Sequence, residues 1–319
     1  MTTQGIIEIT GAAAPALSEP VRELLRARLS PATRRAYRAD LATLARWCER
    51  RGLNAFALSP AELAEFVADQ VRESVAPDTL GRRIAAIRHA YHALNLPDPS
   101  ADPVVREAVA GARRILARPR HAKQPLLAES VRALALSIRG DSAADLRDRA
   151  LVLLGFAGAF RRSELCALRV DDLAFVDAGM RVTIRASKTD QGRAGETIAI
   201  CSSEHAETCP VAAVRRWLAR AGIADGFVFR RIRRGGHVQA APLLPGSVAD
   251  ILVERLGEAG ITGDFAAHSL RSGFLTSAAR AGADLWKMME VSRHRSVQTV
   301  RLYVRDAHLF DNHAGKGLL

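Results

Sequence analysis

The chain has 319 residues, 48% of them apolar, so it is long enough to bury about two cores and is not expected to be disordered. Its formal net charge of +12 favours a polyanionic partner such as nucleic acid, although a merely basic protein would show the same excess. The longest apolar stretch, residues 150–160, is shorter than the roughly 20 residues that span a bilayer. The N-terminus has no basic residue before its apolar part, which argues against a secretory signal. We therefore expect a cytoplasmic protein with no membrane partner.

The four cysteines contain no CxxC pair and are interpreted as free thiols. Cys201, His205 and Cys209 are regularly spaced, but a fourth zinc ligand is not evident. We expect no metal site.

The N-terminal part of the chain predicts a helical domain at residues 21–115, preceded by a loose tail at 1–20. Each expected helix begins where a capping residue or a proline suits a first turn. Residues 116–126 hold two prolines and several basic side chains, which indicates an extended basic linker, with an ordinary solvated loop as the alternative. The four expected helix starts are Ser30-Pro31, Ser59-Pro60, Asp78 and Pro103.

Residues 127–319 predict a second, mostly helical domain that contains a small antiparallel sheet. The segments 180–185 and 196–200 alternate with a period of two, and Asp190-Gln-Gly192 supplies a turn between them. From Val211 to about Val304 the pattern is helical again. The whole chain is thus expected to be mainly α with a small antiparallel β-sheet, in two domains that could both face the same polyanion.

Phosphate chemistry without a metal needs fixed positive charge beside a nucleophile, and two basic segments offer it. In the first, an apolar run ends at Arg161, and Glu164 three residues later can orient that guanidinium from the same helix face. In the second, His268 and Arg271 lie at i and i+3 on one face of a helix, where they can bind a phosphate and move its proton. Each segment alone is more often a solvated helix face.

A third segment places His294 nine residues before Tyr303, although a lone Tyr there would more often be a core aromatic. Lys188 adds a separate signal, because only four of the 46 basic residues are lysines. A lysine can give up its proton as a general acid, whereas an arginine effectively cannot. The other three lysines show that chance also retains this residue type.

Taken together, these residues resemble the catalytic constellation of the tyrosine recombinases, the family of phage integrases and of the Cre and Xer recombinases, over about residues 25–310. One position departs from the family pattern: Arg293 stands where a glycine usually precedes the histidine, so a side chain there could alter the turn that presents His294. The resemblance matches Arg161 to the first catalytic arginine, Lys188 to the strand-turn lysine, His268 and Arg271 to the His-x-x-Arg box, His294 to the later histidine and Tyr303 to the nucleophile.

The resemblance implies cleavage and rejoining of DNA through a 3′-phosphotyrosyl bond, with no metal or cofactor. Arg161 and Arg271 would stabilise the charge on phosphorus, and His268 would accept the proton of Tyr303. His294 would donate to a non-bridging oxygen, and Lys188 would protonate the leaving 5′ oxygen. It also implies a homotetramer on two double-stranded DNA sites, formed from monomers or dimers.

Candidate DNA contacts lie on two expected helices and in the linker. The basic loop 230–236 is a further phosphate candidate, with a solvated loop as the alternative. We expect no arm-binding domain before residue 21, as in the Cre-like and Xer-like members. After Tyr303 the chain is expected either to pack on a neighbouring subunit or to fray. The candidate DNA-binding residues are Arg34, Arg35, Arg38, Arg82, Arg83, Arg88 and Lys123.

Three alternatives remain at this point. A type IB topoisomerase would share the tyrosine chemistry but would relax supercoils without joining two sites. A DNA-binding accessory protein would retain the motifs as relics. A metal-dependent nuclease would lose its activity in EDTA.

Overall fold

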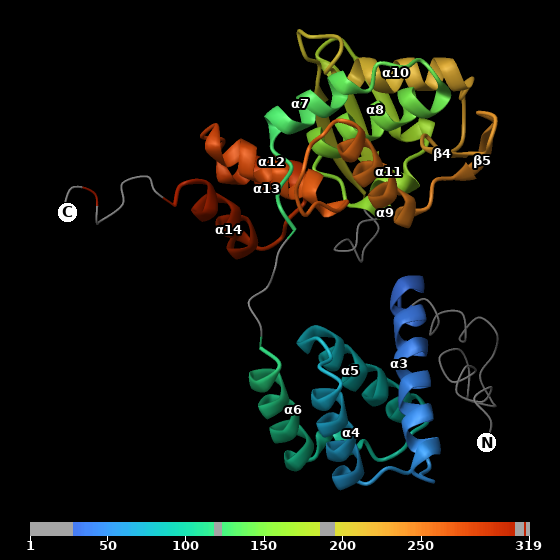
Figure 1. The fold of residues 1–319 in the computed structure, drawn as a ribbon, viewed down its shortest axis with the longest axis vertical. Coiled ribbons are helices and arrows are strands. Elements are labelled where there is room, and N and C mark those ends of the chain that lie inside the picture. The colour runs from blue at the N-terminus through green and yellow to red at the C-terminus, as the bar shows by residue number, and fades with distance from the viewer. Residues whose placement is uncertain (1–27, 118–122, 186–194, 310–315, 317–319) are drawn as a thin grey trace. The chain divides into compact units, whose positions relative to one another are not determined.

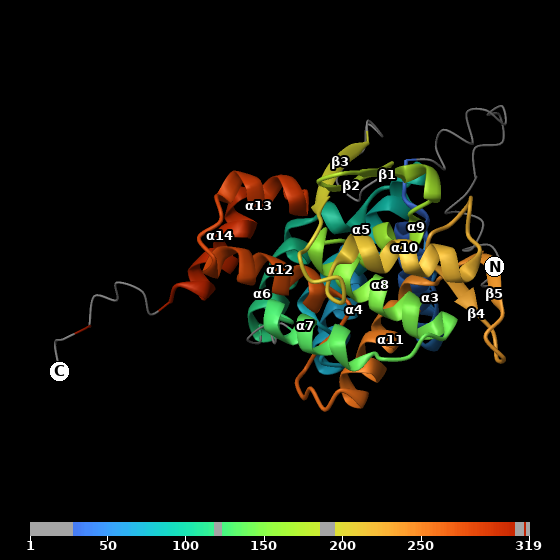
Figure 2. The same ribbon diagram turned by 90° about the horizontal axis from the view of Figure 1, so that it is seen from above.

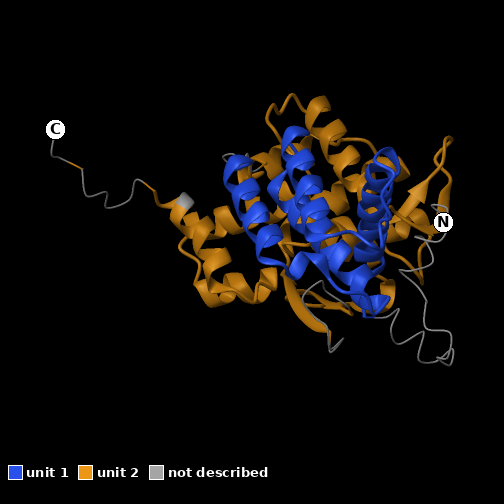
Figure 3. Ribbon diagram, turned by 90° about the horizontal axis from the view of Figure 1, so that it is seen from below, with its two compact units in different colours: residues 1–120 blue, residues 121–319 orange. Residues whose placement is uncertain are grey.

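The computed structural model describes residues 28–117, 123–185, 195–309 and 316. The chain forms two compact units, Met1–Arg120 and His121–Leu319, which Figure 3 shows in different colours. No helix among the described residues is both long and apolar enough to cross a bilayer.

Unit 1 is built from helices that begin where a proline occupies the first turn. The side chain of Ser30 accepts a hydrogen bond from the Thr33 amide at 3.1 Å, and Ser59 forms a reciprocal capping box with Glu62. Because these signals are local, the four expected helix starts are confirmed to within a residue. The described elements, shown in Figure 1, are α3 (Pro31–Arg50), α4 (Pro60–Arg72), α5 (Pro77–Ala93), η1 (Pro99–Ala101) and α6 (Pro103–Ile115).

The core of unit 1 lies between these helices, with α3 packed on α5 and α4 packed on α6. Trp47 and Phe66 are both buried and meet edge to face, with ring centroids 5.4 Å apart. The buried Tyr91 donates its hydroxyl to the Ala55 carbonyl at 3.1 Å and accepts the Leu58 amide at 3.0 Å. Its polar end is therefore satisfied inside the core.

Unit 2 is organised around α8 (Ala143–Ala157), whose residues 150–154 are all buried. That helix packs against α10, α7 and α12, which explains why its residues 150–157 are apolar on every face. Figure 2 shows α10 lying along α8. The remaining helical elements are α7 (Ala128–Ser137), α9 (Arg162–Ala167), η2 (Val170–Asp172), α10 (Pro210–Ala221), α11 (Pro245–Glu258), α12 (His268–Arg280), α13 (Leu285–Ser292) and α14 (Val297–Ala307).

An antiparallel sheet of order β1-β2-β3 confirms the expected strand pair and adds a strand before it. Met180 pairs with Ile200 and Val182 with Ile198, and these four side chains are buried on one face. The predicted turn at 190–192 lies outside the described residues. The strands are β1 (Leu173–Val176), β2 (Gly179–Ile184) and β3 (Glu196–Cys201).

The expectation that helices alone follow one another from Val211 to about Val304 was wrong at one place. Strands β4 (Arg230–Ile232) and β5 (Val238–Pro242) form a second antiparallel pair, so the first residues of the loop expected at 230–236 are a strand. The connection turns at Gly235 and Gly236, whose φ angles of 86° and 79° suit glycine. A three-residue strand is too short for its period to be visible in the sequence.

The expected linker at 116–126 is packed at both ends. Leu116 is buried in the core of unit 1, whereas Leu126 is buried in the core of unit 2. The Leu126 amide donates to the Ser269 carbonyl at 2.9 Å, which ties the start of unit 2 to α12. Residues 118–122 and the expected tail at 1–20 lie outside the described residues.

Candidate active site

The predicted catalytic residues that the structure describes gather in unit 2. Arg161 lies immediately before α9, and His268 and Arg271 lie in the first turn of α12. His294 follows α13 and Tyr303 lies on α14, which packs against α12. Segments more than a hundred residues apart in the chain are thus brought together by helix packing.

Glu164 organises the turn that carries Arg161. Its carboxylate accepts the Arg161 amide at 3.0 Å and pairs with the Arg161 guanidinium at 2.5 Å. Burial opposes ionisation of Glu164, but Arg293 and Arg161 outweigh it and hold the pKa of this carboxyl below its ordinary value. The structure therefore places Glu164 where it orients the first arginine.

Arg271 is the most deeply buried cation of the site, with a relative exposure of 1%. Its Nη1 donates to the Ala159 carbonyl at 2.5 Å, and its Nη2 lies 3.1 Å from Nε2 of His294. Burial, followed by the charges of Arg161 and Arg293, lowers the pKa of the Arg271 guanidinium to about 9. An anion bound beside Arg271 would relieve this penalty.

His294 is held as a neutral imidazole. Burial and the nearby Arg271 lower its pKa to about 4, so it is uncharged at neutral pH. The Ser292 hydroxyl donates to the Met288 carbonyl at 2.6 Å and lies 2.7 Å from Nδ1 of His294. Because that hydroxyl hydrogen is already used, a proton on Nδ1 would satisfy the Ser292 oxygen and would leave Nε2, the nearer of the two ring nitrogens to Nη2 of Arg271, as an acceptor.

Tyr303 and His268 face each other, with 3.5 Å between the phenol oxygen and Nε2. Burial raises the pKa of Tyr303, and the positive charge of Arg271 partly offsets that rise. Burial, with Arg271 and Arg161, also lowers the pKa of His268, so His268 has a free lone pair at neutral pH. This geometry would let the phenol proton pass to Nε2 of His268.

Lys188 lies outside the described residues, between the end of β2 at Ile184 and the start of β3 at Glu196.

The Cys209 thiol accepts the Ala212 amide at 3.5 Å and so caps α10. All four cysteines are free, as expected.

Arg293 is a site residue whose role the sequence did not reveal. It ends α13 with a left-handed backbone, at φ 57° and ψ 42°. Its side chain is buried and pairs with Glu164 at 2.8 Å. The only available signal was an arginine at a turn position that favours glycine.

The DNA-binding candidates of α5 are engaged within unit 1. The Arg82 guanidinium binds both oxygens of Asp40, at 2.8 and 3.1 Å. Arg83 is bound to Gln70, and its side chain is only 17% exposed. Arg88 donates to Ser100 at 3.2 Å and is half exposed.

The other candidates differ in exposure. Arg35 and Arg38 lie exposed on α3, and Arg34 is half buried there. Lys123 forms an ion pair with Asp264. The exposed arginines among the candidates are therefore Arg35 and Arg38 on α3 and Arg82 and Arg88 on α5.

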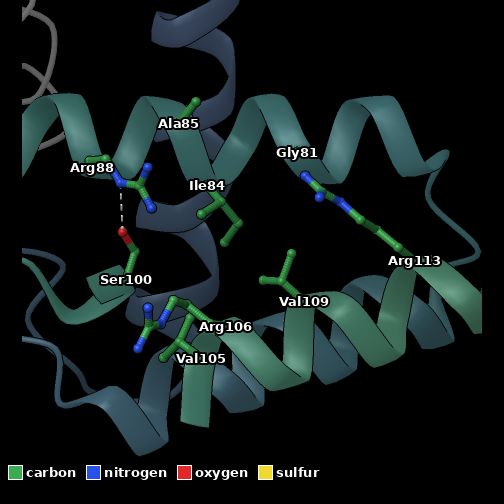
Figure 4. Close-up of a pocket in the computed structure, with 9 residues that line it drawn as sticks. All are labelled: Gly81, Ile84, Ala85, Arg88, Ser100, Val105, Arg106, Val109 and Arg113. Carbon is green, nitrogen blue, oxygen red and sulfur yellow. Dashed lines mark hydrogen bonds between the residues drawn. The ribbon is translucent and has the colours of Figure 1, made fainter. Parts of the chain in front are cut away.

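A pocket of about 480 Å³ lies between α5, η1 and α6 of unit 1 (Figure 4). Arg88, Arg106 and Arg113 stand around its apolar floor. Arg113 reaches across to Gly81, where an added Cβ would lie 3.1 Å from its Nη2 atom. The pocket therefore joins arginines from two helices on one part of unit 1.

Comparisons with known proteins agree on one family. The phage integrase family matches residues 126–309, and the phage integrase N-terminal SAM-like domain matches residues 21–96. An integrase/recombinase xerD homolog of Selenomonas ruminantium is 36% identical over 286 residues, covering 88% of this chain and 84% of that protein. A tyrosine recombinase XerC of Xanthomonas campestris pv. campestris is 31% identical over 284 residues, covering 88% of this chain and 80% of that protein.

Two solved structures share the fold at low sequence identity. The XerH site-specific recombinase bound to palindromic difH substrate gives a TM-score of 0.65 at 14% identity, covering 97% of this chain and 91% of that one. A lambda integrase (75–356) dimer bound to a COC′ core site gives 0.57 at 17% identity, covering 92% and 95%. The chain therefore belongs to the phage integrase family and is a tyrosine-type site-specific recombinase.

Proposed function

We propose that Tyr303 is the nucleophile of this recombinase and that the cluster around it binds the scissile phosphate. The observation that carries the proposal is the 3.5 Å approach of the Tyr303 hydroxyl to Nε2 of His268, beside the buried Arg271. A phenol with an ordinary pKa of about 10 attacks poorly at neutral pH, so it needs a proton acceptor. His268, whose lowered pKa keeps it neutral, supplies that acceptor.

The proposed step exchanges one phosphate ester for another. The Tyr303 oxygen bonds to phosphorus, the bond to the 5′ oxygen breaks, and the phenol proton passes to His268. The leaving 5′ oxygen takes a proton from Lys188, which lies outside the described residues. The resulting 3′-phosphotyrosyl bond retains the ester, so the reverse step rejoins the strand with no nucleotide cofactor.

Arg271 and Arg161 are proposed to stabilise the negative charge that grows on the non-bridging oxygens. Arg161 shares Glu164 with Arg293, whereas Arg271 donates to a carbonyl and an imidazole. Arg271 therefore retains an unneutralised charge in a buried setting, where it acts most strongly on a phosphate.

His294 is proposed to donate a hydrogen bond to the phosphate only after DNA binds. In the DNA-free protein its Nε2 accepts from Arg271, and its pKa of about 4 keeps it neutral. A phosphate placed beside it raises that pKa, because an opposite charge favours the imidazolium. His294 would then change from acceptor to donor as the substrate enters.

Duplex DNA is the proposed partner of both units. The exposed Arg35 and Arg38 of α3 are proposed phosphate contacts, with Arg34 beside them. On α5, Arg82 and Arg88 keep part of their side chains exposed, whereas Arg83 is proposed to hold that helix to α4 through Gln70. Lys123 is proposed to contact DNA only by exchanging its Asp264 partner for a phosphate.

The proposed working form is a homotetramer that joins two DNA sites in the cytoplasm. Structures of relatives bound to DNA, including the XerH complexes and the lambda integrase dimer, support a DNA partner. The domains proposed for this reaction are the helical core-binding domain at 21–115 and the catalytic domain at 127–319.

Two plasmid assays in EDTA test the proposed function. A substrate with two target sites should yield joined products, and a supercoiled plasmid should report any relaxation. Relaxation without joining would favour a type IB topoisomerase, and loss of all activity in EDTA would favour a metal-dependent nuclease. DNA binding that never breaks a strand would favour an accessory protein.

A further inference from the structure

We infer that Arg293 is a positioning residue whose side chain fastens together the segments that carry Arg161, Arg271 and His294. This inference rests on the proposed function, because it assigns Arg293 a task in the same site. Arg293 touches none of the proposed reacting atoms, so it acts through its neighbours.

The backbone of Arg293 adopts a conformation that favours glycine. The residue adopts φ 57° and ψ 42° at the end of α13. A left-handed conformation strains any residue that has a Cβ, and glycine would adopt it freely. This backbone conformation therefore costs free energy at Arg293, and the contacts of its side chain can offset that cost.

That side chain is 1% exposed and is anchored on the turn before α9. Nη1 donates to the Gly158 carbonyl at 3.0 Å and to the Val291 carbonyl at 2.5 Å. Nη2 donates to the Ala159 carbonyl at 3.1 Å and to Glu164 at 2.8 Å. The planar guanidinium thus bridges α13 to residues 158–164, with three hydrogen bonds to that segment and one to Val291 of α13.

The groups that Arg293 binds are also the groups that hold the catalytic arginines. The Ala159 carbonyl accepts from Arg293 and from Arg271. The Glu164 carboxylate pairs with Arg293 and with Arg161. Because His294 is the next residue in the chain, one buried guanidinium fixes the mutual placement of three proposed phosphate ligands.

The contact between Arg293 and Glu164 should also affect how the cleavage rate depends on pH. Glu164 faces Arg161 on its own segment, Arg293 from the end of α13 and Arg271 from α12, while Glu196 of β3 acts on Arg293. Burial raises the pKa of Glu164, and Arg293 is the strongest influence that lowers it. Removing Arg293 should therefore raise the Glu164 pKa, and a protonated Glu164 cannot orient Arg161 as a carboxylate does.

The test compares single-turnover cleavage of nicked suicide DNA, at saturating protein, by wild type, Arg293→Gly and Arg293→Lys. Arg293→Gly relieves the backbone strain but removes the hydrogen bonds of the side chain. We expect it to lower the cleavage rate by about 10- to 100-fold, as is typical when a group that orients catalytic residues is lost. DNA affinity should stay within about twofold, since Arg293 is buried. The acid limb of the pH–rate profile should move to higher pH.

Arg293→Lys separates charge from geometry. Lysine can pair with Glu164 but lacks the planar fork that bridges the carbonyls. We expect the acid limb to return towards wild type while the rate recovers only in part. The double variant Arg293→Gly with Glu164→Gln should remove the new acid limb, since no carboxyl remains to titrate there. Arg280→Ala, which removes an exposed arginine at the end of α12, is the matched control and should cleave like wild type.

The outcomes separate this inference from the proposed function. A Tyr303-dependent adduct in wild type, with an equal rate and acid limb in Arg293→Gly, would overturn the inference alone. No adduct in wild type would overturn the proposed function instead. The inference would then be decided by carbon-detected NMR titration of Glu164, whose carboxyl pKa should be higher in Arg293→Gly than in wild type and unchanged if Arg293 does not hold it.

Discussion

Arg82 in unit 1 and Arg271 in unit 2 differ in how deeply they are buried and in how their charges are paired. In unit 1, Arg82 lies at the surface and is matched by the buried Asp40, so its charge is largely neutralised before any DNA arrives. In unit 2, Arg271 is buried, and burial together with its cationic neighbours lowers its pKa. The comparison teaches that burial and pairing, rather than residue type, decide how much uncompensated charge an arginine retains.

The largest effect should come from Tyr303→Phe, which removes the proposed nucleophile from unit 2 and leaves unit 1 untouched. We expect cleavage of nicked suicide DNA to fall on the order of 10⁵-fold or more, as when other nucleophiles are removed. DNA affinity in a gel-shift assay should be unchanged. Equal cleavage by both proteins would mean that the motifs are relics.

Arg271→Ala should have the next largest effect. Losing one donor to the developing charge lowers cleavage by roughly 10² to 10³-fold. Single-turnover rates at saturating DNA would measure this, with Arg280→Ala as an exposed control in the same helix. A loss of less than about tenfold would contradict the claim that the buried Arg271 matters more for cleavage than an exposed arginine does.

Asp40→Ala tests whether the ion pair between Arg82 and Asp40 stabilises unit 1. It leaves Arg82 without its carboxylate and opens a gap in a buried position, so we expect the free energy of unfolding of unit 1 to fall by about 1–3 kcal/mol. Urea denaturation followed by circular dichroism would report it. An unchanged midpoint would show that the pair is not structural.

Stability should also depend on pH through His294. Its pKa is about 4 in the folded protein and about 6.5 when unfolded, so the unfolded chain binds more protons between these values. The free energy of unfolding should therefore fall as pH drops from about 6.5 to about 4, with no further loss from this group below that. His294→Gln should flatten this part of the urea-derived stability curve, and an unaltered slope would contradict the buried neutral imidazole.

The smallest effect should come from Arg38→Ala on α3. Removing one exposed phosphate contact weakens DNA binding a few-fold for all sequences and reduces the slope of log affinity against log salt by about 1. Fluorescence anisotropy over a salt series would detect it. A change that depended on DNA sequence would show instead that Arg38 reads bases.

Most of the helices could be predicted from residues that lie close together in the sequence. The helices of unit 1 were predictable because Ser30, Ser59 and the prolines that follow them act within one turn. Strands β4 and β5 were missed because each is short and is defined by its partner, as in the pairing of Ile232 with Val238. Long-range pairing leaves little trace in a short apolar run.

The sequence predicted that Arg161, His268, Arg271, His294 and Tyr303 act together and that Glu164 supports Arg161, but it did not predict the contacts of Arg293. The spacing of His268 and Arg271 placed both in one turn of a helix, and the resemblance to a family supplied their partners. The task of Arg293 was not visible, since Gly158 and Glu164 lie 135 and 129 residues away in the chain. Such contacts depend on the packing of α13 beside the turn before α9, which no local pattern encodes.

The most direct measurement of the central claim is to locate the covalent bond. Nicked suicide DNA is incubated with the protein in EDTA, the adduct is digested, and the peptide joined to the 3′ phosphate is sequenced by mass spectrometry. The chain has three tyrosines, Tyr37, Tyr91 and Tyr303. We predict that the nucleotide is attached to Tyr303 alone. Attachment to Tyr37, Tyr91 or another residue, or no adduct at all, would contradict the account.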